Sequence, residues 1–219
     1  MSGKTLAQGI LVVLSSPSGA GKTSLANSIV SENEEIVFSV SVTTRPPRVG
    51  ETEGREYYFK DREKFNTMIN NKEFIEYAEV FGNFYGTPKQ NIEELIQGGK
   101  DVIFDVDWQG GTQIRNSHFA SSVVSIFILP PSIQSLEERL LSRDQDDKYT
   151  VNFRMLEARS EISHWAEYDY VLINDDFSRV KHSIVKIIGV EKMRRQRQPA
   201  LPNFINRLNN EFDLNKNKQ

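Results

Sequence analysis

The chain has 219 residues, 38% of them hydrophobic and 26% charged, and its formal net charge is −3. These values are typical of a globular domain and give no sign of the basic surface that non-specific nucleic-acid binding requires. The absence of cysteine excludes disulfides, thiolate metal ligands and a cysteine nucleophile. No apolar run approaches a membrane span and no signal-like segment begins the chain, so we expect a cytoplasmic protein that binds neither membrane nor nucleic acid.

The first predicted elements are a buried strand over 10–14, a glycine-rich loop, and a helix that runs to about residue 30. The loop is close to the G-x-x-x-x-G-K-[ST] pattern, whose backbone N–H groups surround phosphate oxygens at the positive end of the next helix. Lys22 would reach the β- and γ-phosphates of a nucleotide, and the Thr23 hydroxyl would bind Mg²⁺. The expected phosphate-binding residues are Ser16, Pro17, Ser18, Gly19, Ala20, Gly21, Lys22 and Thr23.

Ser16 departs from this pattern, because it stands where the pattern has its first glycine. A non-glycine residue rarely adopts a positive φ, so the loop keeps its function only if position 16 does not need one. The sequence leaves this question open. The alternative to phosphate binding is a glycine-rich turn without a ligand, which the flanking strand and helix disfavour.

The region from about 40 to 86 interrupts the alternation of strands and helices, and we interpret it as an inserted lobe. Strands are predicted over 38–42, over 56–59, and over 73–81 and 84–85 on either side of a Gly82-Asn83 turn. Asp61 is expected to cap a helix that ends at about residue 71.

Two arginines of this region, Arg45 and Arg48, lie on a loop that Pro46 and Pro47 keep extended. The planar guanidinium group of arginine suits bidentate binding of a phosphate. A solvated loop with two surface charges is the alternative, and composition alone favours it.

The helix after the lobe is expected to have Thr87 as its N-cap and Pro88 as its first residue. The apolar strand that follows it carries Asp105 and Asp107, which are two residues apart and therefore share a strand face. A carboxylate at the end of a buried strand beside a phosphate loop serves Mg²⁺ directly or through water, so Asp105 is a candidate metal ligand. For one of these two acids, capping the next helix is the alternative.

The last part of the chain contains strands over 123–129 and 170–174, with a helical hairpin between them. The hairpin carries Arg139, Arg143 and Arg154, which could be solvated or could close over a polyphosphate. After the last core helix, we expect a short docked helix around residues 204–208 before a frayed end.

Five apolar strands that alternate with helices predict an α/β fold of the P-loop type, a parallel sheet with helices on both faces. Ligands of such sheets bind at the carboxyl ends of the strands, where the phosphate loop, Asp105 and Asn174 all fall. His118 and His164 lie away from this edge, and we interpret them as surface or packing residues.

Several strings of the sequence, in order over about residues 9–195, resemble those of bacterial guanylate kinases, a family of nucleoside monophosphate kinases. They are Ser-Gly-Ala-Gly-Lys-Thr at 18–23, Thr-Thr-Arg-Pro-Pro-Arg at 43–48, Gly-Asn-Phe-Tyr-Gly at 82–86, Asp-Val-Asp-Trp-Gln-Gly at 105–110 and Asn-Asp-Asp at 174–176. The resemblance implies the reaction ATP + GMP ⇌ ADP + GDP with Mg²⁺, dGMP as a further acceptor, and a role in GTP and dGTP supply and GMP recycling. It leaves open whether the protein is a monomer or a homo-oligomer.

The resemblance also implies one domain with a small mixed-β GMP-binding lobe and a helical lid. The implied boundaries are a core of 9–40, 93–138 and 159–195, a GMP-binding lobe of 41–92, a lid of 139–158 and a C-terminal extension of 196–219. By resemblance, the GMP phosphate would be held by Arg45, Arg48, Tyr57 and Tyr85, and guanine would be read by Ser41, Glu76 and Thr87. Asp105 would lie near GMP and the metal, and Asn174 near adenine. The residues implied to act on the transferred phosphoryl group are Lys22, Arg45, Arg139, Arg143 and Arg154.

The chemistry of guanine supports the role of Glu76, because one carboxylate can accept hydrogen bonds from both N1–H and N2–H₂. Adenine would instead turn an acceptor toward it, which buried polar sites reject strongly. Two other functions stay open: a related kinase acting on another phosphate-bearing acceptor such as a ribose bisphosphate, and an interaction module that binds phosphorylated peptides. The complete phosphate loop, with Lys22 and Thr23, argues against the module.

Overall fold

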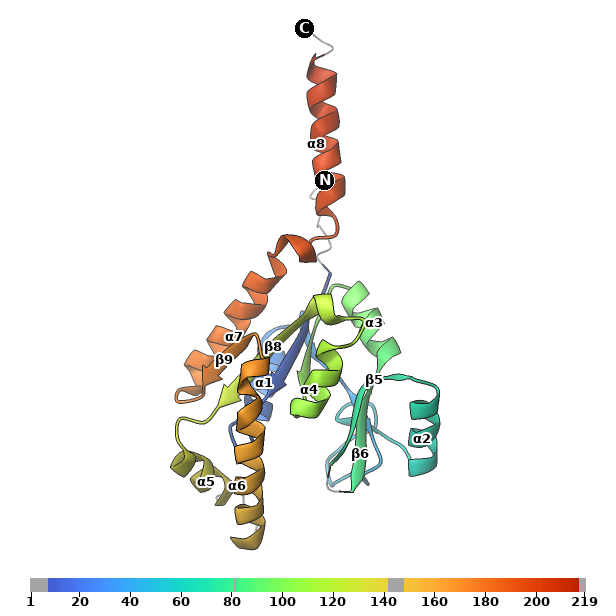
Figure 1. The fold of residues 1–219 in the computed structure, drawn as a ribbon. Helices are drawn as coiled ribbons and strands as arrows, with labels where there is room; N and C mark the ends of the chain where they lie inside the picture. The colour runs from blue at the N-terminus through green and yellow to red at the C-terminus, as the bar shows by residue number, and fades with distance from the viewer. Residues whose placement is uncertain (1–7, 81, 142–147, 217–219) are drawn as a thin grey trace.

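The computed structural model describes residues 8–80, 82–141 and 148–216. Its centre is a five-stranded parallel sheet with the strand order β2-β7-β1-β8-β9 (Figure 1). The strands are β1 (Leu11–Ser15), β2 (Ile36–Phe38), β7 (Asp101–Asp105), β8 (Val123–Leu129) and β9 (Tyr170–Ile173). The predicted five-stranded parallel sheet is therefore confirmed.

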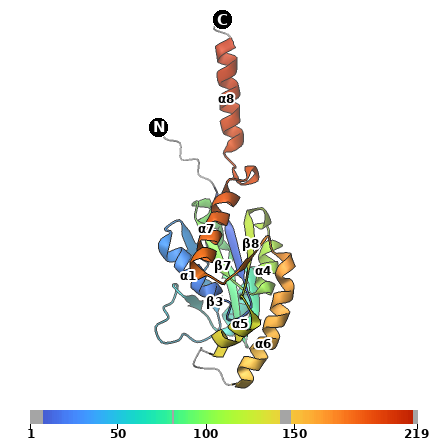
Figure 2. The ribbon, with the colours of Figure 1, turned by 90° about the vertical axis from the view of Figure 1, so that its left-hand side faces the viewer.

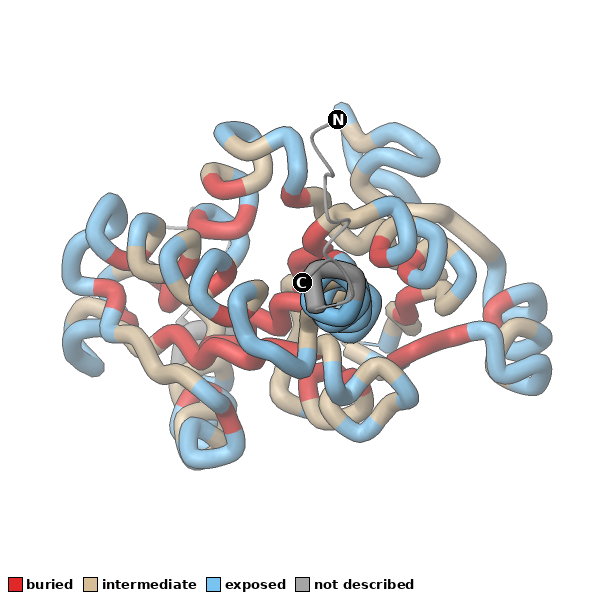
Figure 3. The backbone as a smooth tube through the Cα atoms, turned by 90° about the horizontal axis from the view of Figure 1, so that it is seen from above, coloured by how far each residue is buried: buried red, intermediate tan, exposed pale blue. Residues whose placement is uncertain are grey.

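Helices cover both faces of this sheet, which is why β1 is buried along its whole length. Alternate residues of β1 pack in opposite directions, Val12 with the face covered by α1 (Lys22–Glu32) and α7 (Phe177–Lys192), and Val13 with the other face. That second face is covered by α3 (Lys89–Gln97) and α4 (Trp108–Arg115). Figure 3 shows the buried residues in red running through the middle of the molecule between the helices.

The inserted region forms a second sheet with the order β4-β3-β6-β5. Its strands are β3 (Ser41–Thr43), β4 (Tyr57–Phe59), β5 (Phe74–Val80) and β6 (Asn83–Pro88). Helix α2 (Arg62–Asn70) begins after Asp61, whose carboxylate accepts a hydrogen bond from the N–H of Lys64 at 2.7 Å, as predicted. The ring of Phe65 stacks on Phe74 and Phe84 and forms the small core of this lobe.

The strand predicted over 38–42 is wrong as one element, because the chain changes sheets inside it. Ser39 still bonds to the core sheet, where its N–H donates to the carbonyl of Ile103 at 2.9 Å. Two residues further on, β3 begins and Val42 pairs with Gly86 of the second sheet. Alternation of apolar and polar residues reports that a segment is extended and half-buried, but not which sheet it joins.

The hairpin and the helix after it begin one residue away from their predicted positions. Val80 pairs with Asn83, so Asn83 already belongs to β6 and is not a turn residue, while residue 81 lies outside the described residues. Strand β6 then continues through Pro88, which is the N-cap of α3. Thr87 is therefore a strand residue whose hydroxyl donates to Glu76, and it does not cap the helix.

The predicted helical hairpin is formed by α5 (Ile133–Leu141) and α6 (Lys148–Ile162), packed through Leu136, Leu140 and Ala158. Short 3₁₀ turns are η1 (Ala120–Ser122), η2 (Ser163–Glu167), which joins α6 to β9, and η3 (Arg195–Arg197). Of the described helices, none combines the length and the apolar character needed to cross a membrane.

The C-terminal segment differs from the short docked helix that the sequence predicts. Helix α8 (Leu201–Lys216) has 16 residues and projects away from the rest of the molecule (Figures 1 and 2). Phe204 and Ile205 are each 44% exposed, and Phe212 is 69% exposed. Helical spacing of apolar residues predicts a helix with an apolar face, but it does not say whether another part of the chain lies opposite that face.

Candidate functional site

A cavity of about 740 Å³ opens at the carboxyl ends of β1 and β7, where the sequence places the ligand site. The glycine-rich loop forms one wall, and α6 forms another. Besides the loop, the lining residues are Glu79, Val80, Asp105, Asp107, Trp108, Gln109, Phe153, Arg154, Glu157, Ser160 and Glu161. The cavity thus brings the glycine-rich loop together with a strand-end carboxylate, Asp105, and one arginine of α6, Arg154.

The backbone of the loop answers the question that Ser16 raises. Gly19 and Gly21 have φ values of 87° and 95°, whereas the only described non-glycine residue with a positive φ is Lys72, far along the chain. Ser16 therefore needs no left-handed conformation, and its buried hydroxyl donates to the carbonyl of Pro17 at 3.0 Å. The serine in place of the first glycine puts no strain on the loop.

Two predicted residues, Asn174 and Arg139, hold the loop from behind instead of lining the cavity. The side-chain amide of Asn174 donates to the carbonyl of Ala20 at 2.8 Å. Arg139 donates to the same carbonyl at 3.4 Å and to the carbonyl of Asn174 at 3.3 Å. Their contacts hold the turn at Ala20 in place.

Replacing Gly21 by alanine should destabilise the protein by about 1–3 kcal/mol, because an L residue is strained at this positive φ. The added Cβ would also stand 2.6 Å from the side-chain nitrogen of Asn174. This buried nitrogen cannot move away without losing its hydrogen bond to the carbonyl of Ala20. Urea unfolding measures the loss. Gly189 of α7 is the matched control, since it has open space and no positive φ, and its change to alanine should stabilise by up to about 1 kcal/mol. Equal effects at both positions would contradict the prediction.

Lys22, Thr23 and Asp105 form a tight polar cluster at the floor of the cavity. The Lys22 ammonium lies 2.7 Å from Oδ1 of Asp105 and donates to the carbonyl of Val106 at 2.8 Å. The Thr23 hydroxyl donates to Oδ2 of Asp105 at 2.5 Å. Burial alone would raise the pKa of Asp105, but the charge and hydrogen bond of Lys22 and the bond from Thr23 hold it below its ordinary value. The cluster therefore presents an ionised carboxylate.

The sequence predicts that Asp107 shares a strand face with Asp105. This prediction is wrong, because β7 ends at Asp105. The carboxylate of Asp107 instead accepts a hydrogen bond from the N–H of Gly110 at 2.8 Å, and Asp107 is the N-cap of α4. The capping alternative that the sequence left open therefore applies to this residue. Asp107 still lines the cavity from that position.

The three predicted lid arginines have different positions. Arg154 of α6 lines the cavity, while Arg139 contacts the rear of the loop. Arg143 lies outside the described residues.

Within the lobe, three side chains that the sequence singled out form one buried group. Glu76 is only 4% exposed, and Oε1 accepts a hydrogen bond from the Thr87 hydroxyl at 2.7 Å. The hydroxyls of Thr87 and Ser41 are 3.1 Å apart. A Cβ on Gly110 would stand 3.1 Å from the other oxygen of Glu76, so α4 passes directly beside the carboxylate. Burial raises the pKa of Glu76 to about 7, although the bonds from Thr87 favour the ionised form.

This raised pKa predicts how stability changes with pH. In the unfolded chain Glu76 has its ordinary pKa of 4.5, so between pH 4.5 and about 7 the folded protein holds a proton that the unfolded chain has released. The contribution to stability is complete below pH 4.5 and is lost as the pH rises through about 7. Urea unfolding across this range should show a fall in the wild type that is smaller in E76Q, where Glu161, whose pKa is also raised, still contributes. The same pH dependence in both proteins would contradict the prediction.

A second group of lobe residues surrounds Arg45. One nitrogen of Arg45 contacts both carboxylate oxygens of Glu51 at 2.7 and 2.9 Å, and these bonds raise the pKa of Arg45 further. The guanidinium group lies 5.4 Å from the ring centre of Tyr57, which meets Tyr85 edge-on at 5.8 Å. Burial raises the pKa of Tyr57, and the nearby Tyr85 and Asp105 act in the same direction. These residues do not line the cavity of the phosphate loop, but Asp105 connects the two groups electrostatically.

Arg48 is the one predicted phosphate ligand of the lobe that the structure leaves exposed. Its backbone N–H donates to Oε2 of Glu51 at 2.7 Å, so Glu51 connects Arg48 to Arg45. This carboxylate fixes the proline-containing loop at both arginines.

Sequence reasoning missed the acidic side chains of α6. The carboxylate of Glu161 accepts a hydrogen bond from the N–H of Ser18, a phosphate-loop amide, at 3.1 Å. Burial raises the pKa of Glu161, and this hydrogen bond opposes the rise. Glu157 and Glu161 follow Arg154 by three and seven residues, so all three lie on one helical face. That spacing was a signal available in the sequence.

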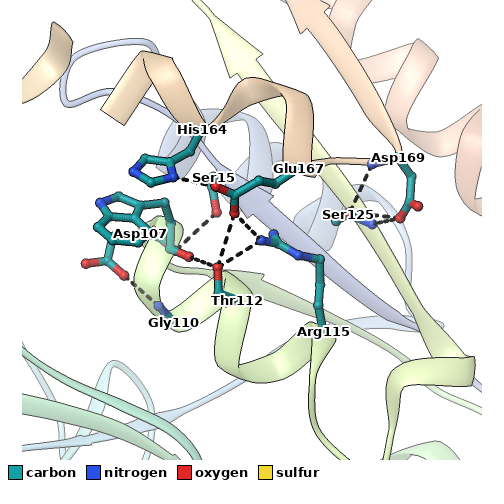
Figure 4. A network of polar contacts seen from close by, with 10 residues as sticks. Ser15, Asp107, Gly110, Thr112, Arg115, Ser125, His164, Glu167 and Asp169 are labelled. Carbon is teal, nitrogen blue, oxygen red and sulfur yellow. Dashed lines mark hydrogen bonds and ion pairs between the residues drawn. The ribbon is translucent and has the colours of Figure 1, made fainter. Parts of the chain in front are cut away.

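Trp108, to which the sequence assigned no role of its own, lines the cavity and contacts the 3₁₀ turn that follows α6. Its ring stacks on His164 of η2, with ring centres 3.8 Å apart, and His164 contacts Glu167 at 2.5 Å. Figure 4 shows how Glu167 then reaches Thr112 and Arg115 of α4. His164 therefore packs between α4 and η2, in keeping with its interpretation as a packing residue.

Known proteins resemble this chain along most of its length. Residues 8–191 match the family model described as guanylate kinase. The guanylate kinase of Cereibacter sphaeroides is 51% identical over 206 residues, which are 94% of this chain and 98% of the relative. That of Paramagnetospirillum magneticum is 45% identical over 201 residues, which are 92% of this chain and 94% of the relative. The crystal structure of guanylate kinase from Anaplasma phagocytophilum matches with a TM-score of 0.74 at 42% identity, covering 90% of this chain and 93% of that chain.

Proposed function

The chain belongs to the guanylate kinase family and transfers a phosphoryl group from ATP to GMP, and we propose that it does so in the cytoplasm with Mg²⁺. It also accepts dGMP, and it serves GTP and dGTP precursor supply and GMP recycling. The observation that carries the substrate assignment is the buried carboxylate of Glu76, held by Thr87 in the lobe beside the phosphate-loop cavity. In this proposal the core is 9–40, 93–138 and 159–195, the GMP-binding lobe is 41–92, the lid is 139–158, and 196–219 is an extension.

In its ionised form, Glu76 selects guanine through its two carboxylate oxygens. One oxygen accepts a hydrogen bond from Thr87, and both have lone pairs for the adjacent N1–H and N2–H₂ donors of guanine. The Ser41 hydroxyl stands beside Thr87 and completes the polar lining of the base site. AMP would leave this buried carboxylate facing the lone pair of adenine N1, and an unpaired buried polar group costs far more than a surface one.

The phosphate of GMP is held by Arg45, Arg48, Tyr57 and Tyr85. The ion pair with Glu51 orients the guanidinium group of Arg45 over the ring of Tyr57, which in turn contacts the ring of Tyr85. Arginine binds phosphate oxygens in a planar, bidentate way, which aligns the attacking oxygen of GMP. Because that oxygen is already ionised, the reaction needs no side-chain nucleophile or general base.

On the ATP side, the N–H groups of the loop and Lys22 hold the β- and γ-phosphates, and Asn174 lies near adenine. Arg143 and Arg154 contribute positive charge from the lid to the transferred phosphoryl group, and Arg139 adds positive charge from behind the loop, where it donates to the carbonyl of Ala20. Glu161 must release the N–H of Ser18 if the phosphates are to use it, because one donor cannot serve both anions. Closure of the lid and the lobe excludes water, which would otherwise hydrolyse ATP.

The residues present fit Mg²⁺. Thr23 and Asp105 supply hard oxygen donors next to the phosphate loop, and Mg²⁺ is usually bound by one or two carboxylates together with substrate phosphates. Within the described residues, no group of three or more acidic or histidine side chains is placed to hold a metal ion by itself, and this mode of binding does not need one. When bound, the ion neutralises charge on the β- and γ-phosphate oxygens.

The proposal is tested by measuring ADP production from Mg-ATP with GMP, dGMP, AMP, CMP, UMP and a ribose bisphosphate as parallel acceptors. Turnover with GMP and dGMP alone, and its loss when EDTA removes Mg²⁺, is the expected result. Equal turnover with AMP would overturn the assignment of the base site to Glu76. Folded protein without turnover on any acceptor would favour a phosphopeptide-binding module instead.

A further inference from the structure

Gln113 of α4 makes two hydrogen bonds to the backbone of the residue that follows Glu76. Its side-chain oxygen accepts from the N–H of Tyr77 at 3.0 Å, and its side-chain nitrogen donates to the carbonyl of Tyr77 at 2.8 Å. The amide thus satisfies both polar backbone groups of one strand residue, much as a neighbouring strand would. Helix α4 lies beside β5 in the fold (Figure 1).

The position of Tyr77 in the lobe sheet explains why this contact matters. Strand β5 is at the edge of the sheet, so one side of it has no partner strand. The register of β5 is irregular between Phe74 and Glu76, and the strand pairs regularly again from Glu76 onward. An irregularity of this kind redirects the side chains of a strand, and on an edge strand only one neighbouring strand fixes their direction. Gln113 adds a second attachment on the open side, directly after Glu76.

Helix α4 also meets the carboxylate itself, at a position three residues before Gln113. The N–H of Gly110 is occupied by Asp107, and a Cβ at Gly110 would stand 3.1 Å from Oε2 of Glu76. The same helix therefore clamps the backbone after Glu76 and forms the wall beside its side chain. Helix α4 is therefore held next to Glu76 at two places, through Gln113 at the backbone and through Gly110 at the side chain.

We propose that Gln113 is a positioning residue that holds the Glu76 carboxylate in the orientation that reads guanine. The inference rests on the proposed function, since it assigns a cause to the base selectivity of Glu76. Gln113 acts through Glu76 and does not touch GMP. Loss of its two hydrogen bonds therefore weakens GMP binding and base discrimination while ATP binding and the phosphate loop remain unchanged.

The test compares Gln113→Met with Gln134→Met. Methionine keeps the length of the side chain but removes both hydrogen bonds. Gln134 is the matched control, because its side-chain nitrogen donates only locally to Glu138 of α5 at 3.0 Å. In Q113M we expect the KM for GMP to rise by about tenfold, the preference for GMP over AMP to fall, and the KM for ATP to stay within about twofold. Q134M should match the wild type.

A double variant separates this inference from the proposed function. If Gln113 acts through Glu76, Q113M should raise the KM for GMP in the wild type but have no further effect in E76Q. A lower melting temperature with an unchanged KM for GMP in Q113M would overturn the inference and leave the proposed function intact. An unchanged KM for GMP in E76Q itself would instead overturn the role of Glu76 on which the inference rests.

Discussion

Replacing Lys22 by alanine is expected to reduce turnover by at least about a thousandfold while the protein stays folded. The ammonium group is the one loop side chain that the proposal places on the β- and γ-phosphates, and a lost charge at that point costs transition-state stabilisation in a water-excluded site. Its structural contribution is smaller, because Asp105 keeps its hydrogen bond from Thr23. ADP release under saturating GMP measures the loss, and circular dichroism and urea unfolding check the fold.

Lys181 offers a matched control for this experiment. It pairs with Glu32 at 2.6 Å and is as little exposed as Lys22, but it lies on α7 away from the cavity. Its change to alanine should leave kcat within about twofold and alter stability by at most about 1 kcal/mol. Wild-type rates in K22A would refute the phosphate role of Lys22.

The second large effect is expected for Glu76→Gln, which replaces one acceptor oxygen by an NH₂ donor of nearly the same size. The donor would face a guanine donor, so kcat/KM for GMP should fall by about 10²–10³. AMP should lose little, and the ratio of kcat/KM for GMP to that for AMP should fall accordingly. Steady-state kinetics with both acceptors measures this ratio.

Glu79→Gln is the control for the same strand. Glu79 lines the cavity from β5 but is exposed, and its ion pair with Arg62 is 3.5 Å long. Its neutralisation should therefore leave the preference for GMP unchanged. A similar loss of preference in E79Q would show that the general charge of β5, rather than the Glu76 contact with guanine, sets the specificity.

The core of the fold could be predicted from the sequence because its signals are local. An apolar run, a glycine-rich loop and a helix follow one another directly, and each signal concerns neighbouring residues. Asp61 marks a helix start in the same local way, and the structure places α2 after it. The function could also be inferred from the sequence, because each motif string lies within a segment of a few residues.

What the sequence could not provide depends on contacts between distant segments. The division of 38–42 between two sheets requires knowledge of the partners Ile103 and Gly86, about 60 and 40 residues away. The separation of Arg139 from Arg154 depends on how α5 packs behind the loop. The pairing of Ser18 with Glu161 and of Tyr77 with Gln113 joins residues 143 and 36 positions apart, which no local pattern reveals.

The ordinary backbone of Ser16 has a consequence for the recognition of related proteins. Of the loop residues, Gly19 and Gly21 are held at a positive φ, whereas position 16 is open to residues with a side chain. Genes can therefore exchange glycine and serine at this codon without a backbone penalty, while the other two glycines stay under steric constraint. A pattern search that demands glycine at the first position would discard intact loops of this kind, and one based on the two constrained glycines, the lysine and the threonine would retain them.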